Sequence, residues 1–130
     1  MTISPWSEYV RLLSPDESLV AEISDASEIS MGGPMWGTLH ISNDFIVERC
    51  NSSIAWSEDS RYLAVPQWDP NRKQQLVVIE PLARKRQYFP GIYRVLEIHQ
   101  FENGIISATD SPAHMPDALE FHLSDLNSQN

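Results

Sequence analysis

The four histidines of this 130-residue chain are the first candidates for metal binding or acid–base chemistry. His40, His99, His114 and His122 are scattered, and no two of them have the short spacing of a zinc-binding motif. Three of the four fall in segments that we predict as strands. We therefore expect these histidines at strand surfaces or strand ends, and we predict neither a metal site nor a cofactor.

No potential nucleophile has the sequence surroundings that covalent catalysis requires. The chain lacks a Gly-x-Ser-x-Gly turn, and its serines and aspartates gather in stretches typical of turns. Cys50 is the only cysteine. Its one close basic neighbour is Arg49, so we expect a small buried side chain there and not a reactive thiolate. We predict that the protein is not an enzyme, and an uncharacterised small enzyme remains a second alternative.

Acidic residues dominate the charge of the chain, which has a formal net charge of −9. Residues 1–60 carry ten acids and two bases, residues 61–100 carry three acids and seven bases, and residues 101–130 carry five acids and no base. An acidic chain repels phosphate backbones, so we expect no nucleic-acid binding. The same acidity suits a basic protein partner.

The acidic and aromatic residues supply the candidate contacts for such a partner. The acids occur in pairs, and no loop has the spaced aspartates of a calcium-binding hand. Tryptophans at strand ends beside loops would mark an interface if exposed, and packing at the edge of the core is the alternative. Trp56, just before a turn, is expected in the core. The candidate partner-binding residues are Asp25, Glu28, Glu58, Asp59, Trp36 and Trp68.

Short apolar or alternating runs separated by polar turns predict antiparallel strands, and no window shows a helical period. The basic run Arg84-Lys85-Arg86 is expected as a turn. A single domain over residues 1–124 is expected, followed by a polar tail over residues 125–130. The strand candidates are residues 8–13, 19–23, 37–42, 45–50, 53–57, 62–67, 75–80, 87–89, 94–101, 105–109 and 119–123.

A period of about 43 residues runs through these strand candidates. Asp16 and Asp59 lie 43 residues apart, as do Ala21 and Ala64, and Ala108 follows Ala64 by 44 residues. Such a period with four short strands has the dimensions of a β-propeller blade. We therefore predict an all-β antiparallel meander of about ten short strands in three units, which form part of a propeller, a twisted sheet or a sandwich.

The segment 54–81, IAWSEDSRYLAVPQWDPNRKQQLVVIEP, resembles one blade of the WD40 or TolB-like propeller families. Those blades have a strand, a Ser-Pro-Asp-Gly-like turn, a Leu-Ala strand and an apolar strand that ends near an acid. Residues 13–23 repeat the first half of this pattern, whereas Ile79-Glu80 replaces the Trp-Asp dipeptide. The resemblance implies a β meander with a binding surface, and it implies no activity. Three units are too few for a closed ring of at least four blades.

The sequence also indicates in which compartment the protein is expected. No run of ~18 apolar residues could cross a membrane, and the first residues have neither the basic region nor the long apolar core of a secretory signal. One cysteine fits a reducing compartment, so we expect a cytoplasmic protein that does not bind membranes.

Small size, strong acidity and the lack of catalytic motifs together predict a protein-binding module. The class that fits best is a small acidic immunity or antitoxin-type inhibitor, which covers a basic toxin with carboxylates. The alternative is a structural or scaffolding module that forms a homo-oligomer and so completes a propeller-like assembly.

Overall fold

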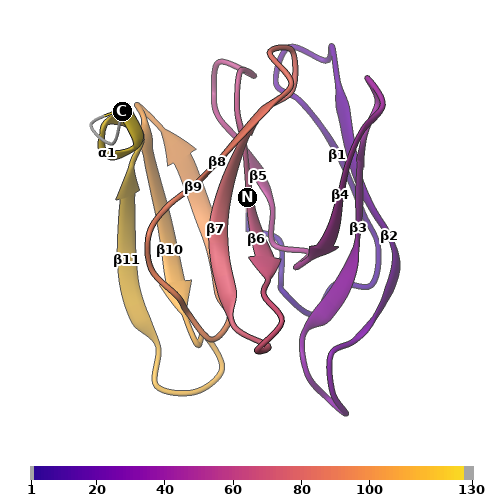
Figure 1. Cartoon of the computed structure of the whole chain (residues 1–130), viewed down its shortest axis with the longest axis vertical. Helices are drawn as coiled ribbons and strands as arrows, with labels where there is room; N and C mark the ends of the chain where they lie inside the picture. Colours follow the sequence, from indigo (N-terminus) through magenta and orange to yellow (C-terminus); the bar gives the residue numbers. More distant parts are fainter. Residues whose placement is uncertain (1, 128–130) are drawn as a thin grey trace.

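The computed structural model describes residues 2–127, and within them the chain is an antiparallel all-β protein with one short helix (Figure 1). The elements are β1 (Val10–Leu13), β2 (Val20–Glu28), β3 (Met35–Ile41), β4 (Phe45–Cys50), β5 (Ala55–Trp56), β6 (Leu63–Trp68), β7 (Gln74–Glu80), β8 (Lys85–Tyr88), β9 (Leu96–Glu102), β10 (Ile105–Asp110), β11 (Asp117–His122) and α1 (Leu123–Asn127). The predicted all-β meander is therefore confirmed.

The strands form three successive meanders, which we call unit 1 (β1–β4), unit 2 (β5–β8) and unit 3 (β9–β11). Hydrogen bonding gives the order β1-β2-β3-β4-β6-β7-β8, with β5 also on β6, and a separate sheet β11-β10-β9. Among the described residues, the strand ladder between units 1 and 2 is a single pair, Cys50 with Gln67. The strands neither close into a barrel nor complete a ring.

The units lie as three layers with an apolar core on each side of the middle one (Figure 1). Side chains of β6 point alternately into the two cores. Leu63 and Val65 pack toward unit 1, whereas Ala64 packs toward unit 3. Every residue of β6 is buried. A strand buried on both faces needs a continuous apolar run, and β6 and β7 each contain one, at residues 63–66 and 76–79.

The two outer faces of the stack carry polar side chains. On unit 3, His99 and Thr109 lie opposite the core residues of their strands, and His99 Nε2 is 2.7 Å from Thr109 Oγ1. On unit 1, exposed His40 and Glu48 alternate with buried neighbours along β3 and β4. Two apolar cores are therefore enclosed by three layers.

The period of about 43 residues is visible as two equivalent turns. In unit 1, Ser14 Oγ donates to Asp16 Oδ1 at 2.8 Å and accepts from the backbone N–H five residues later at 3.1 Å. In unit 2, Ser57 Oγ donates to Asp59 Oδ1 at 2.6 Å and accepts from the backbone N–H five residues later at 3.0 Å. The residue after each aspartate has φ of 63°. The repeat thus encodes one turn geometry twice.

Several predicted strand boundaries differ from the structure, and the differences at β8 and β2 are the most informative. The turn predicted at Arg84-Lys85-Arg86 lies earlier, since the N–H of Arg84 bonds to the carbonyl of Pro81 at 3.1 Å and β8 begins at Lys85. All four residues of β8 are exposed, and charged residues suit an edge strand because they discourage pairing with other chains. Strand β2 also continues beyond the predicted end at residue 23, past an irregularity at Asp25, which has φ of 54°.

The polar tail predicted from residue 125 begins within helix α1. Leu126 is only 3% exposed and belongs to the core between units 2 and 3, and the partly buried Leu123 packs against the same core. Leucines three residues apart lie on one face of a helix, so one turn suffices to bury both. Residues 128–130 of the predicted tail lie outside the described residues.

Candidate functional site

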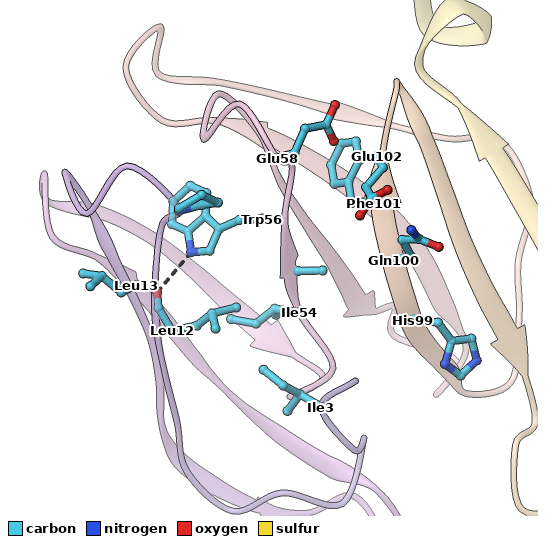
Figure 2. A pocket seen from close by; sticks show the side chains of 12 residues that line it. Ile3, Leu12, Leu13, Ile54, Trp56, Glu58, His99, Gln100, Phe101 and Glu102 are labelled. Carbon is cyan, nitrogen blue, oxygen red and sulfur yellow. Dashed lines mark hydrogen bonds between the residues drawn. The ribbon is translucent and has the colours of Figure 1, made fainter. Parts of the chain in front are cut away.

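A groove of about 350 Å³ lies where the first strands of the three units, β1, β5 and β9, come together (Figure 2). Each of these strands is at the edge of its own unit. One side of the groove is apolar and is formed mainly by units 1 and 2. The other side is formed by unit 3 and carries polar and acidic side chains.

The apolar side is built around Trp56. Its Nε1 donates to the backbone carbonyl of Leu12 at 3.0 Å, across the boundary between units 2 and 1. This bond fixes the indole, of which only 8% is exposed. Leu13 is 41% exposed at the rim, and Ile3 and Ile54 line the groove below it (Figure 2). Trp56 therefore forms a fixed part of the groove lining. The apolar surface that a partner could contact is mainly that of Leu13 at the rim.

The acidic end of the groove is formed by Glu58 and Glu102, which flank Phe101 in Figure 2. The backbone N–H of Asn103 donates to Glu58 Oε1 at 2.9 Å. Asn103 and Gly104 have φ of 54° and 74°, as a tight two-residue hairpin requires. The turn of unit 3 is thus bonded directly to the turn of unit 2.

A second bond joins the turns of units 1 and 2, because the backbone N–H of Asp16 donates to Ser60 Oγ at 2.8 Å. The three turns therefore stand in a row at one end of the molecule. We call this row the acidic ridge. Its exposed carboxylates belong to Asp16, Glu17, Glu58, Asp59 and Glu102.

Hydrogen bonds keep two of these carboxylates ionised. The hydroxyl and backbone N–H of Ser18, and then the hydroxyl of Ser14, lower the pKa of Asp16 from 3.8 to about 2. The hydroxyl of Ser57 is the main cause of a lowered pKa at Asp59. Donors that bond to a carboxylate favour its charged form. The ridge therefore stays negative well below neutral pH.

His99 lies at the other end of the groove (Figure 2). Its Nε2 is close to Thr109 and its Nδ1 is 3.3 Å from Thr2 Oγ1. The nearby carboxylate of Glu97 lies 3.9 Å from the same Nε2 that Thr109 contacts. At 3.9 Å, this carboxylate is too far from Nε2 to make the hydrogen bond that orients the histidine of a catalytic triad. Over residues 2–127, no three metal-ligating side chains are grouped as a metal site.

The structure separates the predicted partner-binding residues into two groups. Glu58 and Asp59 lie on the acidic ridge, in the loop between β5 and β6, which is at the upper end of Figure 1. Asp25, Glu28 and Trp36 lie in the parts of β2 and β3 that adjoin the β2–β3 hairpin, and this hairpin is at the lower end of Figure 1. There, Glu28 and Trp36 line a second hollow of about 310 Å³. One partner surface cannot easily include both groups.

The tryptophans lie mainly inside the protein. Trp68 is 3% exposed, and its Nε1 donates to the carbonyl of Met35 at 3.0 Å. It is thus part of the interior and offers little contact surface, as the core-edge alternative supposed. Trp56 belongs to the core between units 1 and 2, as predicted. Trp36 is half-buried.

Cys50 is a buried side chain, as its sequence context predicted. The residue is 0% exposed, and burial raises the pKa of its thiol to about 12. Its Sγ lies 3.4 Å from the carbonyl oxygen of Val47. A thiol that stays protonated is a poor nucleophile.

Sequence reasoning missed Glu102, Leu13 and His99 as groove residues, because the groove exists only when the units are stacked. A signal was nevertheless present. Glu58 and Glu102 are 44 residues apart, and so are Leu12 and Trp56, which are hydrogen-bonded. Acidic residues separated by one period therefore lie at equivalent positions of neighbouring units, next to each other.

Comparison of the chain with protein-family models, curated proteins and solved structures gave no match. Within residues 2–127, no helix has the length and apolar character needed to cross a membrane.

Proposed function

We propose that this chain is a non-enzymatic protein-binding module of the small acidic immunity or antitoxin type, which neutralises a basic toxin or effector in the cytoplasm. The observation that carries the proposal is the acidic ridge, with its five exposed carboxylates on three adjoining turns. Arg61, in the second turn, has its Nε 2.8 Å from Glu80 Oε2. That contact pairs the guanidinium with Glu80 of β7, and its charge also acts on the neighbouring Asp59.

The fixed position of the ridge supports this function. Backbone-to-side-chain bonds tie the three turns to one another, so the carboxylates are presented without first having to be ordered. A preorganised acidic surface speeds association with a basic partner and selects against acidic ones. The structural alternative has weaker support, because charged and polar side chains such as His40, Glu48 and Glu120 are exposed on the outer faces, although Ile46 is 49% exposed beside His40.

The proposal is tested by isolating the partner and measuring its neutralisation. The tagged chain serves as bait in the native host, and a retained protein is then expressed alone and together with the chain. We expect a basic protein that is harmful when expressed alone, harmless when co-expressed, and bound less tightly as salt rises.

The matched variant is Glu17→Lys/Glu102→Lys, which changes the charge of two ridge residues and leaves the hydrogen bonds of Asp16, Glu58 and Asp59 in place. It should retain the fold and lose protection. Protection by this variant equal to that of the wild type would refute the role of the ridge. Retention of an acidic protein, or of one that is harmless when expressed alone, would contradict the inhibitor class.

A further inference from the structure

Resting on the proposed function, we infer that the groove between β1, β5 and β9 receives one extended segment of the partner, with a lysine or arginine flanked by apolar side chains. The inference names the part of the partner that is recognised, whereas the acidic ridge alone explains only attraction. The inference follows from the size of the groove, from the arrangement of apolar and acidic residues along it, and from its charge.

Size limits the occupant to a short segment. At about 350 Å³, the groove is at the small end of ligand pockets, which span roughly 300–1,000 Å³. A few side chains fit in this volume and a folded domain does not. The groove also lies beside three strands that are each at the edge of a unit, so an extended chain could lie alongside them.

The lining has an apolar part and an acidic part. Leu13 and Ile3 supply apolar contacts at the side of units 1 and 2, beside the immobilised Trp56. Glu58 and Glu102 supply negative charge at one end (Figure 2). An occupant must therefore carry apolar and basic side chains close together.

The charge of the occupant follows from the pair of glutamates. Asn103 N–H occupies Glu58 Oε1 and so fixes the carboxylate over the groove. Both glutamates are exposed, and no lysine or arginine lines this groove in the part of the chain that the structure describes. A guanidinium or ammonium group from a partner would supply the missing positive charge through charge-assisted hydrogen bonds.

The test uses three synthetic pentapeptides with blocked ends and ¹⁵N-labelled protein. The probe is Val-Ser-Arg-Ser-Leu, and its two controls replace arginine by glutamate or both apolar residues by glycine. Backbone and indole N–H shifts are followed by NMR during each titration. We expect saturable shifts at Trp56, Phe101 and Glu102 with the probe, and at least about tenfold weaker binding of both controls.

The variant Glu58→Gln/Glu102→Gln keeps an acceptor for Asn103 and removes both charges. It should weaken probe binding about tenfold or more, whereas Asp25→Asn/Glu28→Gln at the opposite end should change it less than about twofold. Equal binding of the arginine and glutamate peptides, or shifts outside the groove, would overturn the inference. Concentration-dependent dimers that Glu58→Gln/Glu102→Gln abolishes would also overturn the inference, because the occupant of the groove would then be a second copy of this chain.

Failure of this inference is distinguishable from failure of the proposed function. If the isolated partner is neutralised by the wild type and equally by Glu58→Gln/Glu102→Gln, the groove assignment is wrong and the inhibitor function stands. If no basic partner is neutralised, the inhibitor function itself is wrong.

Discussion

The backbone N–H of Asp16 donates a 2.8 Å hydrogen bond to Ser60 Oγ, although the two residues lie 44 positions apart. Asp16 belongs to the first of two equivalent turns, and Ser60 follows Asp59, the aspartate of the second. One copy of the repeat is therefore bonded to the next at the same turn. This relationship converts a spacing in the sequence into a continuous surface feature, the acidic ridge.

The serine that opens each turn is expected to stabilise the fold. Ser57 is 4% exposed and its hydroxyl both donates and accepts within the turn. Ser57→Ala should lower the free energy of unfolding by about 1–3 kcal/mol, because the partly buried N–H of Tyr62 then loses its acceptor. Ser14→Ala should have a similar effect at the equivalent position.

Urea unfolding of both serine variants measures this effect. Ser30→Ala, in an exposed loop, is the control and should leave the unfolding free energy within about 0.5 kcal/mol of the wild type. If Ser57→Ala and Ser14→Ala are as stable as that control, the two turns do not stabilise the units.

Stability should depend on pH through the ridge aspartates. A carboxyl whose pKa is lower in the folded than in the unfolded protein stabilises the fold above its unfolded pKa. For Asp16 the window runs from 3.8 down to about 2, so this contribution is lost as pH falls through that range. Asp59 shifts in the same direction.

Unfolding followed from pH 6 to pH 2 tests the aspartate effect. Asp16→Asn should flatten the fall in stability between about pH 4 and pH 2, because the amide does not titrate. An identical pH profile for Asp16→Asn and the wild type would show that the Asp16 carboxyl does not contribute.

The Cys50 thiol should not react in the folded protein. Its side chain is fully buried and burial raises its pKa to about 12, so almost no thiolate is present at pH 8. We expect no colour with Ellman's reagent under native conditions and one equivalent after unfolding in guanidinium. Fast labelling of the native state would mean that the boundary between β4 and β6 opens readily.

The strands were predictable from sequence where they have both a clear pattern and a clear turn. Residues 45–50 were predicted with the boundaries of β4, since apolar and polar residues alternate there after the turn at Ser42-Asn43-Asp44. The predicted start of β8, at residue 87, was two residues too late. A run of basic residues is typical of a turn unless the strand is known to lie at the edge of a sheet. Helix α1 was missed, because its one turn is held by tertiary burial of Leu126.

The candidate site was less predictable than the fold. Glu58 was identified as an acid in a turn, but its relation to Glu102 depends on the stacking of units 2 and 3. Local patterns describe each turn separately, and they do not distinguish the two ends of the molecule. Asp25 and Glu28 were therefore grouped with Glu58, although they lie in β2 toward the β2–β3 hairpin, which is at the opposite end from the loop between β5 and β6 (Figure 1).

The affinity of the isolated partner for two charge-reversed variants tests the partner surface most directly. Glu58→Lys/Glu102→Lys reverses the acidic end of the groove, and Asp25→Lys/Glu28→Lys makes the same change of charge near the β2–β3 hairpin. Titration calorimetry at low and physiological salt should show more than about tenfold weaker binding for the first variant. The second should stay within about threefold of the wild type, apart from the loss of long-range attraction at low salt. Equal weakening by the two variants, or greater weakening by Asp25→Lys/Glu28→Lys, would contradict a partner site at the groove.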